Sequence, residues 1–293
     1  MHFINKYRKG MPLPKKMLED TMYRIYWLIN YFKNGKQIKT ALFYPQFPSK
    51  STVLHKAFRY LNFNITNNPE KIHSVAIFWY DWTFSEPDGK VLELAKTKKV
   101  VNLHCNDISK SYVDEVFNKI FGYSSLVDCT NYTGLMVKKN EINAVHDGEI
   151  VQGPVAREQG FVYQKLINNV VGGKFVADMR VPVIGGKIPL VFVKYKTLET
   201  RFGLFKRFHH RLKNAEVHPP DKLFSADEIE KIILFCNEFG LDYGEVDVLR
   251  DLDDGRIYLI DVNNTPTGPP YLDKKAKKEA LQAMASAFAE AFI

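Results

Sequence analysis

The sequence predicts a mixed α/β (α+β) protein with an N-terminal α/β domain followed by a larger, strand-rich part. Over residues 1–105, short apolar runs alternate with helical patterns, which is typical of a parallel sheet with crossover helices. Short β runs separated by turn signals fill residues 133–193. The last strand pair, at 244–266, is a hairpin. These observations favour a parallel sheet in the first part and antiparallel strands in the second.

The composition fits a folded protein with anionic ligands. The 293 residues are 45% hydrophobic and 13% aromatic, which allows a large buried core, and the length favours two domains. A formal net charge of +8 favours nucleotides, phosphorylated metabolites or nucleic acid as ligands. Three widely spaced cysteines indicate neither zinc nor a disulfide framework and fit a reducing compartment. The N-terminus lacks the apolar segment of a signal peptide and no apolar run could span a bilayer, so we expect a cytoplasmic protein.

The N-terminal part shows strand and helix patterns in alternation. Its helix at 17–33 has apolar residues at helical spacing, such as Met22, Ile25 and Phe32. The further elements that we expect are a strand at 38–45, a helix at 52–61, a strand at 73–82, a helix at 92–98 and a strand at 100–105.

A helix is expected at 107–122, with Asp107 or Ser109 as N-cap and Gly122 at its end. The β runs that follow lie at 134–139, 148–153, 160–167 and 175–193. A basic stretch at 201–213 precedes a helix at 225–240, and an amphipathic helix at 274–293 closes the chain.

The hairpin at 244–266 carries the clearest chemical signal. If its loop is a three-residue turn at 253–255 and Leu252 pairs with Arg256, then Asp247 lies opposite Asp261, and Asn263 projects from the same face. Two facing carboxylates repel each other unless a cation lies between them, and Mg²⁺ prefers such oxygen ligands. The alternative is a solvated polar face on an edge hairpin.

This hairpin resembles the terminal motif of ATP-grasp enzymes, a family that includes D-alanine–D-alanine ligase, glutathione synthetase and ribosomal-protein glutamate ligases. In the family, an acidic residue on one strand and an (E/D)-x-N motif on the next bind Mg²⁺ that bridges the ATP phosphates. The resemblance implies that Asp247, Asp261 and Asn263 are the metal ligands. It also implies an N-terminal pre-ATP-grasp domain at 1–105 and an ATP-grasp domain at 106–293, with a β-rich lid at about 134–170 and a C-terminal antiparallel-sheet subdomain.

Upstream segments match the family in the same order. The resemblance implies that Lys110 and Lys138 contact the ATP phosphates, with Lys139 the competitor of Lys138. The side chain of Gln164 and the backbone of Lys165 and Leu166 would hold the adenine edge. The charge on the γ-phosphate would be met by two arginines, Arg180 and, as the second candidate, Arg201. Each of these residues alone is more often a surface or structural residue, so the prediction depends on their order.

Two departures from the family pattern bear on the chemistry. The lid loop at 140–148 is not glycine-rich, so Asn143 and Gly148 are candidates to replace the phosphate-covering glycines. Glu245 stands where several peptide-type ligases have an arginine that binds the reacting carboxylate. That charge would have to come from another residue, such as Arg180, Arg201 or Arg207.

The implied function is an ATP- and Mg²⁺-dependent (or Mn²⁺-dependent) carboxylate–amine ligase that works through an acylphosphate and releases ADP and phosphate. A small-molecule kinase on the same fold is the alternative. Nucleic-acid binding by the stretch at 201–213 is disfavoured, because a loop over a polyanionic substrate explains the same residues. The expected substrates are an amine and a carboxylate on a small molecule, peptide or saccharide. We expect no membrane partner, and a homodimer is an open alternative.

Overall fold

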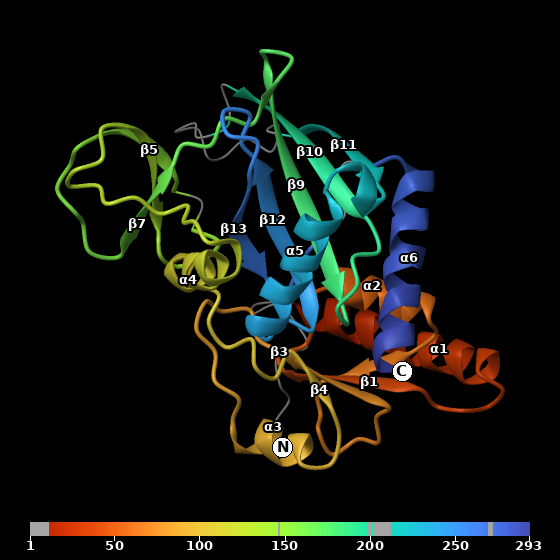
Figure 1. Cartoon of the computed structure of the whole chain (residues 1–293). Coiled ribbons are helices and arrows are strands. Elements are labelled where there is room, and N and C mark those ends of the chain that lie inside the picture. Colours follow the sequence, from red (N-terminus) through yellow and green to blue (C-terminus); the bar gives the residue numbers. More distant parts are fainter. Residues whose placement is uncertain (1–11, 146, 199–200, 202–211, 269–271) are drawn as a thin grey trace.

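The computed structural model of the chain describes residues 12–145, 147–198, 201, 212–268 and 272–293. Three sheets make up the architecture: a four-stranded parallel sheet, a six-stranded antiparallel sheet and a separate three-stranded sheet. Figure 1 shows the parallel sheet below the six-stranded sheet and the three-stranded sheet standing to one side. The α/β class expected from the sequence is confirmed.

The N-terminal domain has strands in the order β2-β1-β3-β4, all parallel. The sequence did not predict β2, which is only three residues long, and the strand expected at 100–105 is reduced to two residues. The helix expected at 92–98 begins earlier, because Asp88 caps it by accepting from the backbone N–H groups of Lys90 and Val91. The bounds are α1 Leu13–Lys33, β1 Thr40–Pro45, α2 Val53–Tyr60, β2 Asn64–Thr66, β3 Val75–Trp79, α3 Gly89–Ala95 and β4 Val100–Val101.

The central sheet has the strand order β11-β10-β9-β12-β13, with β8 paired to β9. In Figure 1, α5 lies in front of the central sheet, and α6 lies beside the sheet at the right. The helix expected at 107–122 is α4; its N-cap is Ser109, and Gly122 at φ 78° ends it. The bounds are α4 Lys110–Phe121, β8 Val170–Val171, β9 Phe175–Ile184, β10 Val191–Thr197, β11 Leu212–His218, η2 Pro220–Lys222, α5 Ala226–Glu238, β12 Tyr243–Arg250, β13 Ile257–Asn263 and α6 Lys274–Phe292. Most of the basic stretch at 201–213 lies outside the described residues.

The three-stranded sheet falls in the range expected for the lid, 134–170, and is called the lid below. It consists of β5 Gly134–Asn140, β6 Glu149–Gly153 and β7 Phe161–Lys165, in the order β6-β5-β7. Its own small core is formed by Cys129, Met136 and Tyr163. This separate core allows the lid to keep its shape independently of the central sheet.

Two larger cores join the elements of the two domains, and a smaller one packs α3 against the parallel sheet. One lies between α4, α5 and the central sheet, and is centred on buried residues such as Phe117, Phe235 and Val246. The other joins the parallel sheet to α6 through Phe43, Phe58 and Phe288. By contrast, the apolar side chains of Met22, Ile25 and Phe32 on α1 are exposed.

A polar joint connects the two domains at the start of β12. Asn102 follows β4 with φ 63°, and its side-chain Nδ2 donates to the carbonyl of Tyr243 at 2.7 Å. Its Oδ1 accepts from the N–H of Tyr243 at 2.8 Å. Nearby, Gly240 at φ 73° lies so close to the backbone of His104 that a Cβ would clash at 2.7 Å. The joint therefore fixes the N-terminal domain against the strand that carries Asp247.

No helix within the described ranges is both long and apolar enough to cross a membrane.

Candidate active site

The floor of the site is the β12–β13 ladder. Asp247 lies opposite Asp261 and Glu245 lies opposite Asn263, so the predicted pairings are confirmed. The turn predicted between them was wrong: nearer the loop, Arg250 pairs with Ile257, one position away from the expected register. A β-bulge after Asp247 absorbs the difference.

The bulge changes which face Ile260 occupies. Strict alternation of side chains along β13 would place Ile260 on the core face with Val246 and Val248. In the structure those two valines are fully buried, whereas Ile260 is half-buried and lines a cavity on the opposite side of the hairpin. The cavity thereby gains an apolar wall beside its carboxylates.

Asp247 is neutralised by neighbouring cations. Arg180 on β9 donates to both of its oxygens, from Nε at 2.8 Å and from a terminal nitrogen at 2.9 Å, and Lys194 on β10 donates to Oδ1 at 3.1 Å. Burial alone would raise the pKa of Asp247, but the charges of Arg180 and Lys194 hold it well below its usual range. Asp247 is therefore ionised, and the charge of Arg180 is largely committed to it.

Asp261 has a different environment from Asp247. Its Oδ1 is buried and has no hydrogen-bond partner among the described residues. Burial and the negative charge of Asp247 raise its pKa to about 6. Asn263, which pairs with Glu245, also has a buried Nδ2 without a hydrogen-bond partner among the described residues. A bound ligand could therefore supply partners to both Asp261 Oδ1 and Asn263 Nδ2.

Glu245, at the position where the resemblance implies an arginine, is 2% exposed. Burial raises its pKa to about 7, against the opposing charge of Arg180, whose Nε lies 3.5 Å from Oε2. This side of the site is thus less positive than the family pattern implies.

A cavity of about 240 Å³ lies between this floor and the lid. Cationic and anionic side chains both reach it, and six apolar residues complete its wall. It is lined by Lys110, Val137, Lys139, Ile142, Asn143, Ala144, Asp147, Gly148, Gln164, Lys165, Ile167, Asp178, Lys196, Arg201, Asp247, Leu249, Ile260 and Asp261. Among the predicted residues, Lys138, Leu166, Arg180 and Asn263 are not part of this lining.

The two lid lysines point to opposite sides of β5, because side chains alternate along a strand. Lys138 pairs with Glu158 and Glu149 and lies over the ring of Phe161, away from the cavity. Lys139 lines the cavity, so the geometry favours it over the predicted Lys138. Withdrawal from solvent lowers the pKa of Lys139 to about 8, helped by the nearby charge of Lys110.

Lys110 begins α4 and is 8% exposed. Its ammonium group donates to the carbonyl of Ile142 at 3.3 Å. Among the described residues, no carboxylate forms an ion pair with Lys110 or Lys139. Two cations thus face the cavity without a direct ion pair among the described residues, although the charge of Asp261 acts on both, and this arrangement suits an anionic ligand.

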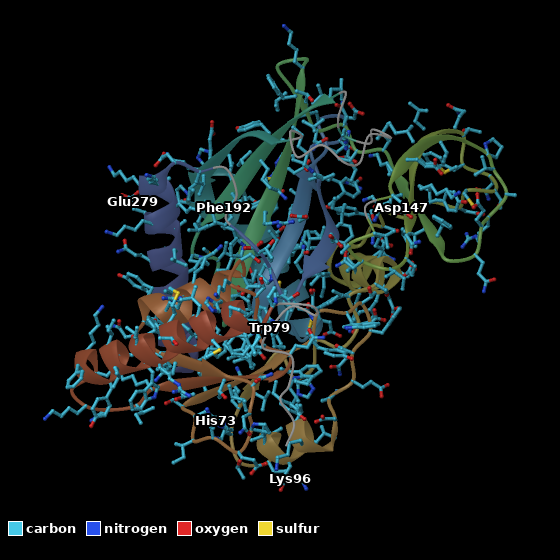
Figure 2. All side chains as sticks on the ribbon, turned by 180° about the vertical axis from the view of Figure 1, so that it is seen from behind. His73, Trp79, Lys96, Asp147, Phe192 and Glu279 are labelled. Atoms are coloured by element: carbon cyan, nitrogen blue, oxygen red, sulfur yellow. The ribbon has the colours of Figure 1, made fainter. Side chains whose placement is uncertain are left out.

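Hydrogen bonds connect the lid loop to the N-terminal domain, to β13 and to the start of α4. The backbone N–H of Asn143 donates to Thr83 of the N-terminal domain at 2.8 Å, and its Nδ2 donates to the carbonyl of Val262 on β13 at 3.1 Å. Glu141 accepts from the backbone N–H and the hydroxyl of Ser111 at the start of α4. Figure 2 labels Asp147 on the lid, near the central sheet. Asn143 and Gly148 both line the cavity, as expected for residues that replace a glycine-rich loop.

The predicted adenine hinge lies along β7. Gln164 is buried and lines the cavity, and so does Lys165, whose ammonium pairs with Asp251 at 2.6 Å and Asp254 at 2.9 Å. Ile167 lines the cavity and Leu166 does not; the predicted contact of the Leu166 backbone with adenine stays a prediction. Arg201 also lines the cavity and donates to the carbonyl of Ile167 at 2.9 Å.

Sequence reasoning missed three charged residues on the floor of the site. Asp178 and Lys196 line the cavity and pair with each other at 2.5 Å, and Lys194 contacts Asp247. Lys194 and Lys196 alternate with Val193 and Tyr195, which was a signal for one charged face, but only the pairing with β9 shows that this face belongs to the site.

The donor set fits a divalent cation bound through oxygen. The described residues contain no group of three His, Cys, Asp or Glu that could hold a metal. Asp247, Asp261 and Asn263 instead offer two carboxylates and an amide. Asp247 accepts three hydrogen bonds, which leaves one of its roughly four lone-pair positions, and Oδ1 of Asp261 is without a partner. Such a set is suited to Mg²⁺, which takes one or two protein carboxylates together with phosphate oxygens.

Solved structures with the same architecture are ATP-grasp proteins. The D-alanine–D-alanine ligase from Bacillus anthracis is 11% identical, with a TM-score of 0.54 over 87% of this chain and 97% of that one. The VanG D-Ala:D-Ser ligase from Enterococcus faecalis is 11% identical, with a TM-score of 0.53 over 88% and 100%. D-cycloserine synthetase DcsG is 15% identical, with a TM-score of 0.50 over 86% and 98%. The chain therefore has the ATP-grasp fold.

Neither a protein-family model nor a curated protein matches the sequence. The fold-level resemblance inferred from the hairpin is thus confirmed by structure alone.

Proposed function

We propose that this chain is a Mg-ATP-dependent carboxylate–amine ligase. The observation that carries the proposal is the cavity itself. It presents Lys110 and Lys139, which form no direct ion pair among the described residues, above a ladder that sets Asp247 against Asp261. A ligand that satisfies both must bring negative charge for the lysines and a cation for the carboxylates. A nucleoside triphosphate with its magnesium ion does both.

Each group of residues has a part in binding. Lys110 and Lys139 contact the phosphate chain, while Gln164 and the backbone around Lys165 and Leu166 hold the adenine. Mg²⁺, or Mn²⁺ in its place, would be held by Asp247, Asp261 and Asn263. It would supply positive charge to the β- and γ-phosphate oxygens.

The chemistry then depends mainly on positioning and electrostatics. A substrate carboxylate oxygen attacks the γ-phosphorus, the bond to the β-phosphate oxygen breaks, and ADP leaves. An amine next attacks the acyl carbon, phosphate leaves, and the amine proton passes to solvent. Arg201 supports the transferring phosphoryl group, and Arg180 has one terminal nitrogen outside its bidentate contact with Asp247. The fastened lid loop excludes water, which would hydrolyse the acylphosphate.

The substrates are an amine and a carboxylate borne by a small molecule, peptide or saccharide. The three similar structures include two ligases of D-amino acids, which makes small carboxylates the first class to test. The cysteines, Cys105, Cys129 and Cys236, are buried and free, which fits the cytoplasm. A homodimer remains an alternative to a monomer.

A kinase that stops after phosphoryl transfer is the second candidate. Glu245 favours it, because a buried acid beside Arg180 removes the positive charge that would stabilise the tetrahedral intermediate of amide formation.

The test is ATP turnover with Mg²⁺, pooled carboxylates and hydroxylamine as surrogate amine, with ADP and hydroxamate measured together. We expect equal amounts of ADP and hydroxamate. ADP with a stable phosphorylated product and no hydroxamate would establish the kinase, and failure to bind Mg-ATP would contradict both.

A further inference from the structure

The first helix, α1, turns an apolar face away from the rest of the molecule. Six apolar side chains recur on it at helical spacing and cover an arc of about 120°, at about 100° per residue. They are Leu18, Met22, Ile25, Leu28, Ile29 and Phe32, with exposed fractions between 45% and 65%. A surface helix of a globular protein ordinarily turns such a face towards the core. The apolar face of α1 is therefore available to a partner outside the chain.

Polar groups attach the opposite side of α1 to the body. The residues at positions 26, 30 and 34 lie four apart and so share one side of the helix. Their hydrogen bonds run from the Tyr26 hydroxyl to the carbonyl of Arg59 at 2.7 Å, from Asn34 Nδ2 to the carbonyl of Asn62 at 2.9 Å and from Asn30 Nδ2 to Asn64 Oδ1 at 3.4 Å. These bonds keep the apolar face directed outwards.

Positive charge is concentrated in the same part of the chain. Residues 1–39 contain nine Lys or Arg and only two acids, so a formal +7 of the total +8 lies there. Arg24 and Lys33 are exposed and lie at the two borders of the apolar face.

This charge helps to identify the partner. Two copies that paired through α1 would bring like charges together, and the apolar arc is wider than the narrow seam of a coiled coil. The surface of an anionic bilayer accepts both the apolar side chains and the positive charges. The features of α1 thus favour a lipid surface over a second copy of the chain.

A second cavity lies beside this face, among α1, α2 and the edge strand β2. Its volume is about 960 Å³. Arg24, Arg59 and Lys71 line it, and its described lining contains no carboxylate. Leu28 also lines it, as does Ile72, which is 95% exposed. The cavity therefore joins cations to exposed apolar groups, a combination that suits the phosphate and the upper acyl chain of a lipid.

We propose that α1 binds the surface of an anionic lipid bilayer, with its apolar face in the interface and the cations of the second cavity facing lipid phosphates. From the sequence we expected no membrane partner, because no apolar run could span a bilayer. A helix that lies in the interface does not need to span it. Figures 1 and 2 show α1 and the lid at opposite sides of the molecule, so a bilayer at α1 leaves the lid accessible. This inference does not depend on the proposed function.

The experiment is co-sedimentation of the full chain with vesicles of phosphatidylcholine alone and of equimolar phosphatidylcholine and phosphatidylglycerol. We expect the wild type to bind the mixed vesicles more tightly, and added salt to weaken that binding. The double variant Ile25→Ser, Phe32→Ser removes two apolar side chains from the exposed face. Its partition into mixed vesicles should fall by about 10- to 100-fold. Its urea unfolding should match the wild type, since both side chains are exposed.

The matched control is the double variant Leu92→Ser, Leu234→Ser. It removes two apolar side chains of similar exposure, 49% and 48%, from α3 and α5. This control should bind like the wild type, and an equal loss in both double variants would overturn the proposal. If the α1 variant does not fold, Arg24→Gln with Lys33→Gln decides, because it should weaken binding and reduce its salt dependence.

Two further results would also overturn the proposal. One is a wild type that does not sediment with the mixed vesicles. The other is a vesicle-free dimer, detected by light scattering, that Ile25→Ser with Phe32→Ser dissociates while vesicle binding stays unchanged. In that case the apolar face of α1 would be an interface between two copies of the chain.

Discussion

At the scale of single residues, the two aspartates of the ladder differ in what they do for the fold. Asp247 is bonded to Arg180 and Lys194, whereas Oδ1 of Asp261 has no described partner and faces a like charge. A buried carboxylate that repels its neighbour lowers the stability of the ligand-free protein. Its presence at Asp261 is explained if this carboxylate binds a ligand.

Asp261→Asn should therefore abolish turnover without harming the fold. Removing one of two facing charges should leave the free energy of unfolding unchanged or raise it by up to about 1 kcal/mol. Turnover and urea unfolding, both followed in the same preparation, check this. Near-normal turnover would contradict the metal site, and a large loss of stability would contradict the view that Asp261 is unsatisfied.

Lys139 should make Mg-ATP affinity depend on pH. It faces Lys110 and Arg201 as like charges and Asp261 and Asp178 as opposite ones, and withdrawal from solvent lowers its pKa to about 8. The charged form binds phosphate, so affinity should be highest below pH 8 and should be lost as the pH rises through that value. We expect the dissociation constant to rise by about 3- to 30-fold between about pH 7 and 9.5.

Lys139→Arg should flatten this profile, because a guanidinium stays charged throughout the range. Lys138→Ala is the matched control. Its ammonium pairs with Glu158 outside the cavity, so the slope should persist. A wild-type profile without a slope in this range would rule out Lys139 as a phosphate contact.

At the scale of elements, the hairpin shows what the sequence can and cannot predict. The pattern of Asp247, Asp261 and Asn263 was sufficient to predict their pairing, because side chains alternate along each strand. The bulge that moves Ile260 into the cavity was not predictable, because the Asp253-Asp254-Gly255 sequence is compatible with more than one loop. Local sequence was thus sufficient to predict how these three polar residues are paired, but not the apolar wall beside them.

The lid shows a related limit. The adjacent lysines of β5 were both predicted as candidate phosphate contacts, but choosing between them requires knowing which face of the strand is turned towards the central sheet. That choice depends on the pairing of Lys139 with Val162 and Lys138 with Tyr163, and on the core that holds Tyr163. Which of the two lysines faces the cavity is therefore set by long-range packing, and a sequence pattern does not contain that information.

At the scale of the whole molecule, the site depends on surfaces from both domains. Thr83 of the N-terminal domain fastens the lid loop, and Asn102 holds the start of the strand that carries Asp247. The sequence predicted most of the helices and strands on both sides of this contact. It did not predict their junction, because Asn102 looks like an ordinary turn residue until its amide is seen to bond both backbone groups of Tyr243.

Asn102→Ala should loosen this junction and weaken the whole protein. It removes both hydrogen bonds, leaves two buried backbone groups of Tyr243 unsatisfied, and places alanine at φ 63°. We expect a loss of about 2–5 kcal/mol in the free energy of unfolding, measured by urea titration.

Asn102→Gly removes the same hydrogen bonds at a position where glycine is unstrained. The difference in unfolding free energy between the two variants therefore measures the cost of placing alanine at a positive φ. The exposed Asn118→Ala on α4 serves as the control and should change stability little. Wild-type stability in Asn102→Ala would show that the apolar contacts around Phe43 and Phe288 hold the domains together without the polar joint.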